Sequence, residues 1–220
     1  MTLPLPFPAP PIESGSPIHA SISPTALARI ACALEIWQGH GAQIVSLPWV
    51  APEEFVRGTR PEGLHGQDVA TPHGHLLASG EQAFCWMARQ GLLEQDGPFV
   101  GWTPCFRDEP SFDGTHHYGF VKAEAFAWTE LSPLPLQIRV LANRALAAMR
   151  ILAGPGVPVS LVPKEDGSID VEMAGIEIGS CGARRLPGKG PARTYLYATV
   201  MSEPRFSQAL EIARPGGSGA

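Results

Sequence analysis

The segment at residues 105–124, CFRDEPSFDGTHHYGFVKAE, gathers charged and aromatic side chains on both sides of a short polar turn. Arg107 and two acids precede the turn, and Lys122 and Glu124 follow it at alternate positions, where their side chains share one face of a strand. An arginine presents a planar fork of donors that suits phosphate, and a glutamate accepts hydrogen bonds from an amine. The local pattern is compatible with a nucleotide-binding hairpin and equally with an ordinary hairpin that has a solvated charged face.

Helices and further strands must position this hairpin. Residues 24–39 are predicted to be helical because Ser23 can cap the first turn, Pro24 suits it, and apolar residues recur at helical spacing. Further helices are predicted at residues 133–152, after Gly80, and in EPRFSQALEIA near the C-terminus. The apolar positions of the first two are Leu27, Ile30, Ala31, Leu34 and Trp37, and Ile138, Leu141, Ala145, Ala148 and Leu152.

Strands are predicted in GPFVGWTPCFRDE, YGFVKAEAFAW, PVSLVP, IDVEMAGIEIGSC and TYLYATVM. AQIVSLPWVAPEEF is predicted to be a strand that lies at a sheet edge or runs into an irregular segment, because it contains Pro48 and Pro52. Residues 58–75 are predicted to be a loop. The order of elements predicts an α+β fold with a largely antiparallel sheet.

Composition restricts the class of protein. The chain has 220 residues, 16 basic and 21 acidic, and its formal charge of -5 disfavours broad electrostatic capture of a nucleic acid. No apolar run reaches the roughly 18 residues of a membrane span, and the N-terminus lacks the pattern of a secretory signal, so a soluble, cytoplasmic protein is expected. Four scattered cysteines suit reduced thiols. We expect a Pro-rich arm at residues 1–22, one domain at 23–213 and a flexible tail at 214–220.

The hairpin resembles the second signature motif of class II aminoacyl-tRNA synthetases, in which Phe-Arg-x-Glu ends one strand and a His or Arg lies four residues before a Phe on the next. The residues that fill those places are Phe106, Arg107, Glu109, His116 and Phe120. RDEPSFDGTHHYGF is similar to the phenylalanyl enzymes, and CFRDEPS is similar to the seryl-like amino acid:carrier-protein ligases.

Four more segments resemble class II elements in the expected order. The helix from Pro24 and the strand with Pro48 resemble the first motif, which lies at a dimer interface in that family. LLASGEQAF resembles a Thr-x-Glu segment of the family, and IEIGSCGARR resembles the Glu-Ile-Ser-Ser-Cys segment of the seryl enzymes. ATVMSEPRFSQAL resembles the third signature motif. The residues that match are Ser79 and Glu81, then Glu177, Ser180 and Cys181, and finally Arg205. The resemblance covers residues 24–212 and implies an antiparallel sheet flanked by helices.

This resemblance implies a site for ATP, Mg²⁺ and an amino acid. Activation joins a carboxylate to the α-phosphate of ATP, so cationic groups must offset the repulsion between anions. The implied ATP contacts are Arg107 to the α-phosphate, Arg205 to the γ-phosphate, Phe120 stacking on adenine, Glu109 near the adenine amine and His116 near the terminal phosphates. Glu177 would hold Mg²⁺. The implied amino-acid contacts are Ser79, Glu81, Glu124, Ser180 and Cys181.

The chain also departs from the family pattern. The third motif spaces three glycines ahead of its arginine, and here Ala198, Val200 and Ser202 occupy those positions, with Pro204 just before the arginine. Some seryl-like relatives hold Zn²⁺ with Cys, Glu and Cys. Glu124 and Cys181 could be two of these ligands, but the first position falls near Ser79, so a complete zinc site is not expected.

The predicted function is therefore that of a stand-alone class II synthetase-like ligase. No anticodon-binding domain follows the third motif and the turn of the hairpin is short, so we expect a carrier protein or small molecule as acceptor in place of a full tRNA, and a homodimer. Two alternatives stay open. One is a catalytically degenerate paralogue that binds an amino acid or regulates a partner, and the other is a trans-acting tRNA-binding or editing factor.

Overall fold

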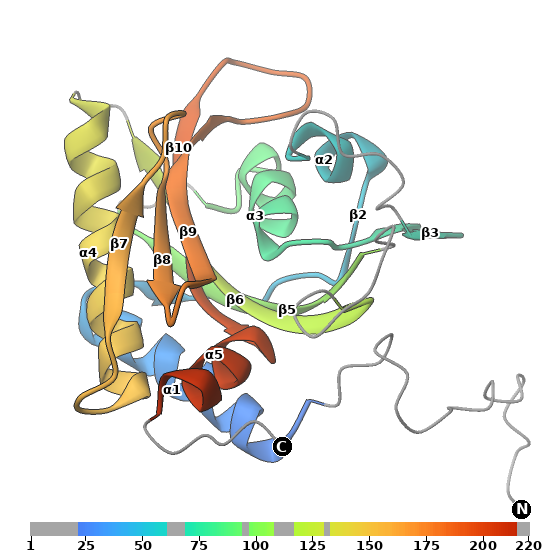
Figure 1. Ribbon diagram of the computed structural model, residues 1–220. Coiled ribbons are helices and arrows are strands. Elements are labelled where there is room, and N and C mark those ends of the chain that lie inside the picture. The colour runs from blue at the N-terminus through green and yellow to red at the C-terminus, as the bar shows by residue number, and fades with distance from the viewer. Residues whose placement is uncertain (1–21, 61–68, 94–96, 108–116, 130–132, 215–220) are drawn as a thin grey trace, which may run out of the picture.

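The computed structural model describes residues 22–60, 69–93, 97–107, 117–129 and 133–214. These residues form a seven-stranded sheet, a separate three-stranded sheet and five helices (Figure 1). The large sheet has the order β1-β5-β6-β10-β9-β8-β7 and is antiparallel except where β1 pairs with β5. The prediction of an α+β fold with a mostly antiparallel sheet is confirmed. No helix in these ranges has the length and apolar character that a bilayer crossing requires.

The strands of the large sheet are bounded as follows: β1 Gln43–Ile44, β5 Phe99–Phe106, β6 Gly119–Thr129, β7 Val159–Pro163, β8 Ile169–Met173, β9 Ile176–Arg185 and β10 Thr194–Glu203. The predicted hairpin is the pair β5 and β6, in which Phe106 is aligned with Gly119. IDVEMAGIEIGSC, predicted as one strand, divides into β8 and β9, because Ala174 and Gly175 adopt positive φ and turn the chain between them.

Three helices cover one face of the large sheet: α1 Pro24–Gly39, α4 Leu134–Ala153 and α5 Arg205–Ala213. Their apolar sides, which include Ile30, Leu141 and Phe206, bury a core against β6, β9 and β10. The side chain of Ser23 caps α1 by accepting a hydrogen bond from the backbone nitrogen of Ala26 at 3.1 Å, as the sequence predicts.

The other face carries α2 Glu53–Gly58, α3 Gly80–Arg89 and the small sheet of β2 Val50–Ala51, β3 Val69–Thr71 and β4 Gly74–Leu76. A second core lies beneath them, around Phe84, Phe126 and Tyr195. The edge position expected for the segment around Pro48 and Pro52 is confirmed, because β1 lies at the edge of the large sheet and β2 at the edge of the small one. The segment is nevertheless not one strand, since it divides into β1, β2 and the short helix α2. The loop expected at 58–75 is wrong in part, because it contains β3 and the first two residues of β4. These elements have two to six residues each, too few to give a clear periodicity, and packing of residues such as Phe55 stabilises them.

Candidate active site

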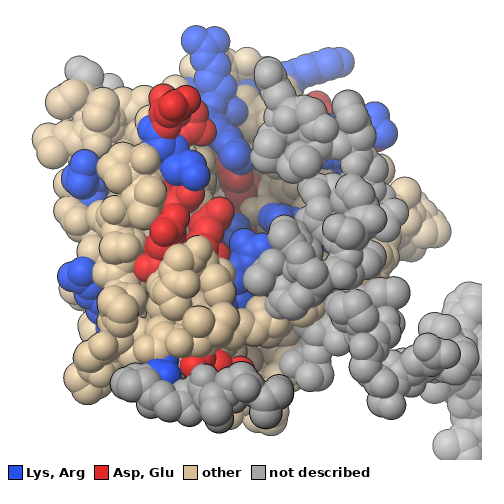
Figure 2. Space-filling model, viewed as in Figure 1, with Lys and Arg blue, Asp and Glu red and all other residues tan. Residues whose placement is uncertain are grey.

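A cavity of about 260 Å³ lies against the face of the large sheet that α2 and α3 cover. Its charged lining residues are the cations Arg60, Arg107, Lys122, Arg184 and Arg205 and the acids Glu81, Glu124 and Glu177. Figure 2 shows acidic and basic side chains side by side in the central part of the visible face. Five cations therefore face three carboxylates in the described lining, so this part of the wall has a positive balance and suits an anionic ligand such as a nucleotide phosphate.

Arg107, Phe120 and Arg205, which the sequence implies for the nucleotide, all line this cavity. The Nε of Arg107 donates to the carbonyl oxygen of Ala78 at 3.1 Å, and its guanidinium lies 5.1 Å from the centroid of the Phe120 ring. Arg205 is the first residue of α5, where the helix dipole favours an anion. An aromatic ring and two guanidinium groups thus line the same cavity, although they come from segments nearly a hundred residues apart.

Two residues implied for the nucleotide, Glu109 and His116, lie outside the described residues. The neighbouring His117 lines the cavity, and its Nε2 is 3.3 Å from the Nε2 of Gln208 on α5. This contact joins the segment just before β6 to the helix that begins with Arg205.

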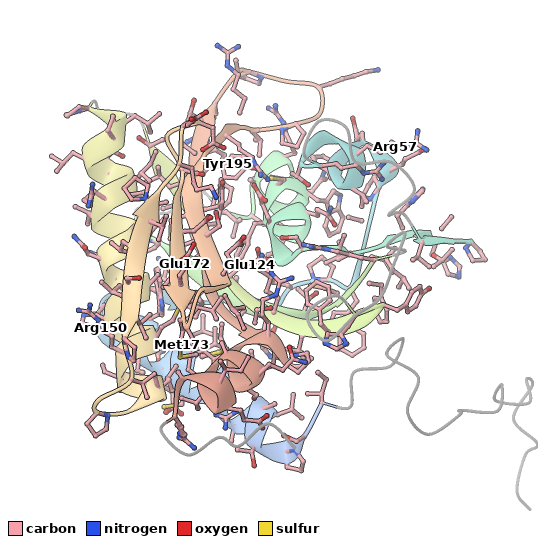
Figure 3. The ribbon with its side chains drawn as sticks, viewed as in Figure 1. Arg57, Glu124, Arg150, Glu172, Met173 and Tyr195 are labelled. Carbon is pink, nitrogen blue, oxygen red and sulfur yellow. The ribbon has the colours of Figure 1, made fainter. Side chains whose placement is uncertain are left out.

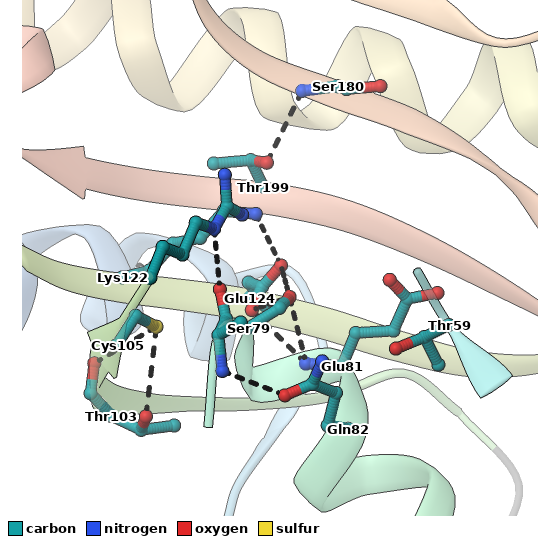
Figure 4. Close-up of polar contacts among 12 residues, drawn as sticks. Thr59, Ser79, Glu81, Gln82, Thr103, Cys105, Lys122, Glu124, Ser180 and Thr199 are labelled. Carbon is teal, nitrogen blue, oxygen red and sulfur yellow. Dashed lines mark hydrogen bonds and ion pairs between the residues drawn. The ribbon is translucent and has the colours of Figure 1, made fainter. Parts of the chain in front are cut away.

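Glu124 of β6 is held by several donors in the middle of the cavity wall (Figure 4). Lys122 lies 2.6 Å from its Oε1, the Ser79 hydroxyl lies 2.8 and 2.7 Å from its two oxygens, and the backbone nitrogen of Glu81 donates to Oε2 at 3.1 Å. Burial alone would raise the pKa of Glu124, but the charge of Lys122 and these hydrogen bonds outweigh it and hold the pKa below its ordinary value. Glu124 is therefore an ionised carboxylate in a fixed orientation.

Glu81 lies in the first turn of α3, and its carboxylate is buried. The Nη1 of Arg184 lies 2.7 Å from Oε2, and the hydroxyl of Tyr195 donates to Oε1 at 2.6 Å. Burial raises the pKa of Glu81, and the nearby Arg184 and Tyr195 oppose that effect without cancelling it. Ser79, Glu81 and Glu124 thus form one connected polar cluster, as their implied shared role requires.

Glu177 and Ser180 of β9 also line the cavity. Loss of water around the Glu177 carboxyl raises its pKa, and the charge of Asp170 adds to this effect, whereas Arg205 opposes it. A bound cation would relieve the crowding of negative charge. No group of three or more side chains that could ligate a metal occurs in the part of the chain that the structure describes. Mg²⁺ needs only one or two protein carboxylates when substrate phosphates supply the other ligands, so Glu177 fits such an ion.

Cys181 is the one implied site residue in the described ranges that the structure does not bring to the cavity. Its side chain is fully buried in the core beneath α1 and α4, because successive residues of β9 point to opposite faces of the sheet. Glu124 faces the cavity, so the two residues considered as zinc ligands lie on opposite faces.

The residues that replace the third-motif glycines are divided between the two faces of β10. Ala198 and Val200 are buried in the core, whereas Ser202 lines the cavity. A β-bulge between Thr199 and Met201 causes this division, because it interrupts the alternation and leaves both Thr199 and Ser202 on the cavity side. Two of the three replacements therefore add no side chain to the cavity.

Several cavity residues were not predicted from the sequence. Lys122 was placed on the same strand face as Glu124, but no role in the site was predicted for it. Arg184 follows Ser180 by four positions, so alternation on β9 is a signal that could have found it. The roles of Tyr195 and Tyr197 depend on how β9 and β10 are aligned. The guanidinium of Arg184 lies 4.6 Å from the centroid of the Tyr197 ring.

Solved structures similar to this chain include pyrrolysyl-tRNA and seryl-tRNA synthetases, which are class II enzymes. Over 87% of its length the chain matches 73% of a pyrrolysyl-tRNA synthetase from Desulfitobacterium hafniense, with a TM-score of 0.62 and 14% identity. It also matches the seryl-tRNA synthetase from Pyrococcus horikoshii complexed with ATP, with a TM-score of 0.62 and 18% identity over 85% of this chain. A cytoplasmic serine-tRNA ligase from Naegleria fowleri in complex with AMP matches 85% of this chain, with a TM-score of 0.61 and 15% identity.

The chain therefore has the fold of a class II aminoacyl-tRNA synthetase catalytic domain, which confirms the resemblance seen in its motifs. It spans about half the length of the two seryl enzymes, 49% in each case. No protein-family model and no curated protein sequence matches it.

Proposed function

We propose that this chain is an ATP-dependent ligase that activates an amino acid as an aminoacyl-adenylate and transfers it to a carrier protein or small molecule. The observation that carries this proposal is that Arg107, Phe120 and Arg205 line the same cavity as the connected cluster of Ser79, Glu81 and Glu124. ATP-bound and AMP-bound proteins among the structural neighbours support a nucleotide at such a site.

In the first reaction an oxygen of the amino-acid carboxylate forms a bond to the α-phosphorus of ATP. The bond between that phosphorus and the bridging oxygen to the β-phosphate breaks, and pyrophosphate leaves with the electron pair. Arg107 would offset negative charge at the α-phosphate, Arg205 would hold the terminal phosphate, and Phe120 would stack on the adenine. Mg²⁺, held by Glu177, would supply further neutralisation of the phosphates when bound.

The amino acid would lie against the polar cluster. Its ammonium group needs acceptors, and the carboxylates of Glu81 and Glu124 and the Ser79 hydroxyl supply them. Because Glu124 is held by Lys122 and by the backbone nitrogen of Glu81, its oxygens keep a fixed orientation as the substrate enters. In the second reaction a thiol or amine of the acceptor attacks the carbonyl carbon of the adenylate, loses its proton to solvent, and releases AMP.

We also propose a cytoplasmic homodimer. All four cysteines are free thiols, which suits a reducing compartment. Leu27 of α1, Ile44 of β1 and the nearby Trp49 are 44%, 44% and 56% exposed, in the segment whose family counterpart lies at a dimer interface. Sedimentation of the wild-type chain and of Trp49→Glu tests this point, and we expect the substitution to shift a dimer toward monomer.

Exchange of radiolabelled pyrophosphate into ATP, measured with each of the twenty amino acids, tests the first reaction. We expect exchange that depends on one amino acid or on a small chemically related group. Absence of exchange, together with no binding of ATP, would show that the chain is not a ligase. Transfer is tested with a phosphopantetheinylated carrier protein and with cysteamine, which supply a thiol with and without a protein surface.

A further inference from the structure

Arg184 lies at the end of the cavity opposite Arg205. Glu177, whose carboxyl senses the charge of Arg205, lies near the start of β9, and Arg184 follows it by seven residues on the same strand. Seven residues of a strand span on the order of 20 Å, which separates Arg184 from Glu177. Arg184 is paired in register with Tyr195, at the other end of β10 from Glu203. Arg184 therefore lies beyond Glu81, on the side away from the phosphate-binding groups.

Protein contacts hold the guanidinium of Arg184 in place, but they use only part of its N–H donors. Its Nη1 donates to the Oε2 of Glu81 at 2.7 Å and to the carbonyl oxygen of Thr59 at 3.0 Å, and the group stacks on the Tyr197 ring. Across the described ranges, its Nε and Nη2 donate to no protein acceptor. Three N–H donors of a planar group that lines the cavity thus remain for a ligand.

The lining at this end is largely polar. Arg60, which follows Thr59, lines the cavity together with Arg184, and Arg184 is ion-paired with Glu81. The uncharged lining residues here are Val56, Thr59, Gln82 and Tyr197, which give a large apolar side chain little surface. Both ends of the Gln82 amide already have protein partners. Its Oε1 accepts a hydrogen bond from the backbone nitrogen of Ala78, and its Nε2 donates to the carbonyl oxygen of Val56.

We propose that Arg184 is a specificity-determining residue and that the acid activated at this site is an amino acid with a carboxylate side chain. A planar guanidinium can donate two parallel hydrogen bonds to a carboxylate, which an amide of the same shape cannot accept. This inference rests on the proposed function, because it concerns the same amino-acid site. A purely positioning role for Arg184, in which it only orients Glu81, would affect all amino acids equally.

Pyrophosphate exchange with aspartate and glutamate, compared with asparagine and glutamine, tests the inference on the wild-type chain. We expect kcat/KM to favour one acid over its own amide by about tenfold or more, since a site built for a charged group leaves its donors unsatisfied with the amide. In Arg184→Met that ratio should fall toward one, and in Arg184→Lys part of it should remain. Arg57→Met, which removes an exposed arginine of α2, is the matched control and should keep the wild-type ratio.

The outcomes separate this inference from the proposed function. If a neutral or basic amino acid supports exchange and neither acid exceeds its amide, the proposed function stands and the inference is wrong. An equal loss for acid and amide in Arg184→Met also overturns it, because that result describes a positioning residue. If no amino acid supports exchange, the proposed function itself fails. The wild-type ratio decides the question even if Arg184→Met does not fold.

Discussion

The backbone nitrogen of Glu81 donates a hydrogen bond to the carboxylate of Glu124 at 3.1 Å. The two residues are 43 positions apart, and the bond joins the first turn of α3 to the middle of β6. Because the same nitrogen lies at the N-terminus of a helix, Glu124 also benefits from the positive end of that helix dipole. This hydrogen bond couples the positions of Glu81 and Glu124, the two residues whose carboxylates are proposed to bind the substrate ammonium. A substitution at either residue should therefore displace the other.

The ion pair of Lys122 with Glu124 should stabilise the folded chain to an extent that depends on pH. In the wild-type chain the pKa of Glu124 is lowered, so its contribution to stability is present above the ordinary pKa of a glutamate and is lost as the pH falls through the lower folded value. In Lys122→Met the burial of Glu124 is no longer offset by the charge of Lys122, so the pKa of Glu124 should rise. The ionised carboxylate then destabilises the folded state, and protonation removes this destabilisation.

We therefore expect Lys122→Met to lower the free energy of unfolding by about 3 kcal/mol near pH 7, the scale for breaking a buried ion pair, and by clearly less near pH 5. Urea unfolding at both pH values measures the difference. A loss of stability that stays constant with pH would contradict the assignment of the effect to Glu124.

Arg107 and Arg205 should each be needed to bind ATP. Substituting either with alanine removes a cation from the cavity, and we expect ATP affinity to fall by about 10- to 100-fold, the scale of one or two hydrogen bonds to a charged group. Isothermal titration with ATP measures the change. Arg139→Ala, which removes an exposed arginine of α4 on the opposite face of the sheet, should leave the affinity unaltered. Equal losses in all three variants would point to general electrostatics and not to a site.

Arg89 should hold the connection between β9 and β10. Its guanidinium donates to the carbonyl oxygens of Leu186, Pro187, Gly188 and Pro191 at 2.8–3.2 Å. Arg89→Lys should not rescue Arg89→Ala, because an ammonium cannot reproduce the planar fork. Hydrogen exchange of residues 186–193 should accelerate in both variants, with a stability loss of about 1–3 kcal/mol. Wild-type exchange rates in Arg89→Lys would show that charge alone organises the loop.

Gly182 should keep Tyr197 in place beneath Arg184. A Cβ atom at this position would lie 2.6 Å from the Tyr197 hydroxyl oxygen, so the ring must move and the stacked guanidinium with it. We expect Gly182→Ala to raise the KM for the amino acid by about tenfold and to leave ATP affinity unchanged. Gly39→Ala, where the added atom meets nothing within 4 Å, is the control. An unchanged KM would mean that the amino acid does not contact this end of the cavity.

The sequence predicts the long elements because their patterns are local. Ser23 and Pro24 mark the start of α1, and the alternation around Lys122 and Glu124 defines β6. The motifs also identify Arg107, Phe120 and Arg205, which the structure places around one cavity. Each of these signals lies within a few residues of the position that it identifies.

The interactions that tune the site are not local. Arg184 meets Glu81 across 103 positions, and this contact depends on the register of β9 with β10 and on where α3 packs. The bulge at Val200, which puts Ser202 on the cavity side while Ala198 and Val200 face the core, has no signature in the residues themselves. Cys181 was assigned to the substrate by motif resemblance, and its core position follows from the strand alternation that the resemblance did not consider.

The most direct test of the central claim is a crystal structure of the chain with a non-hydrolysable ATP analogue. We expect one nucleotide in the cavity, with Arg107 at the α-phosphate, Arg205 at the γ-phosphate and the adenine against Phe120. Arg107, which follows β5, Phe120 of β6 and Arg205 of α5 already line this cavity. Figure 3 shows Glu124 of the same cavity lining between the strands of the large sheet and α3. A nucleotide bound elsewhere, or a cavity without nucleotide at saturating concentration, would contradict the account.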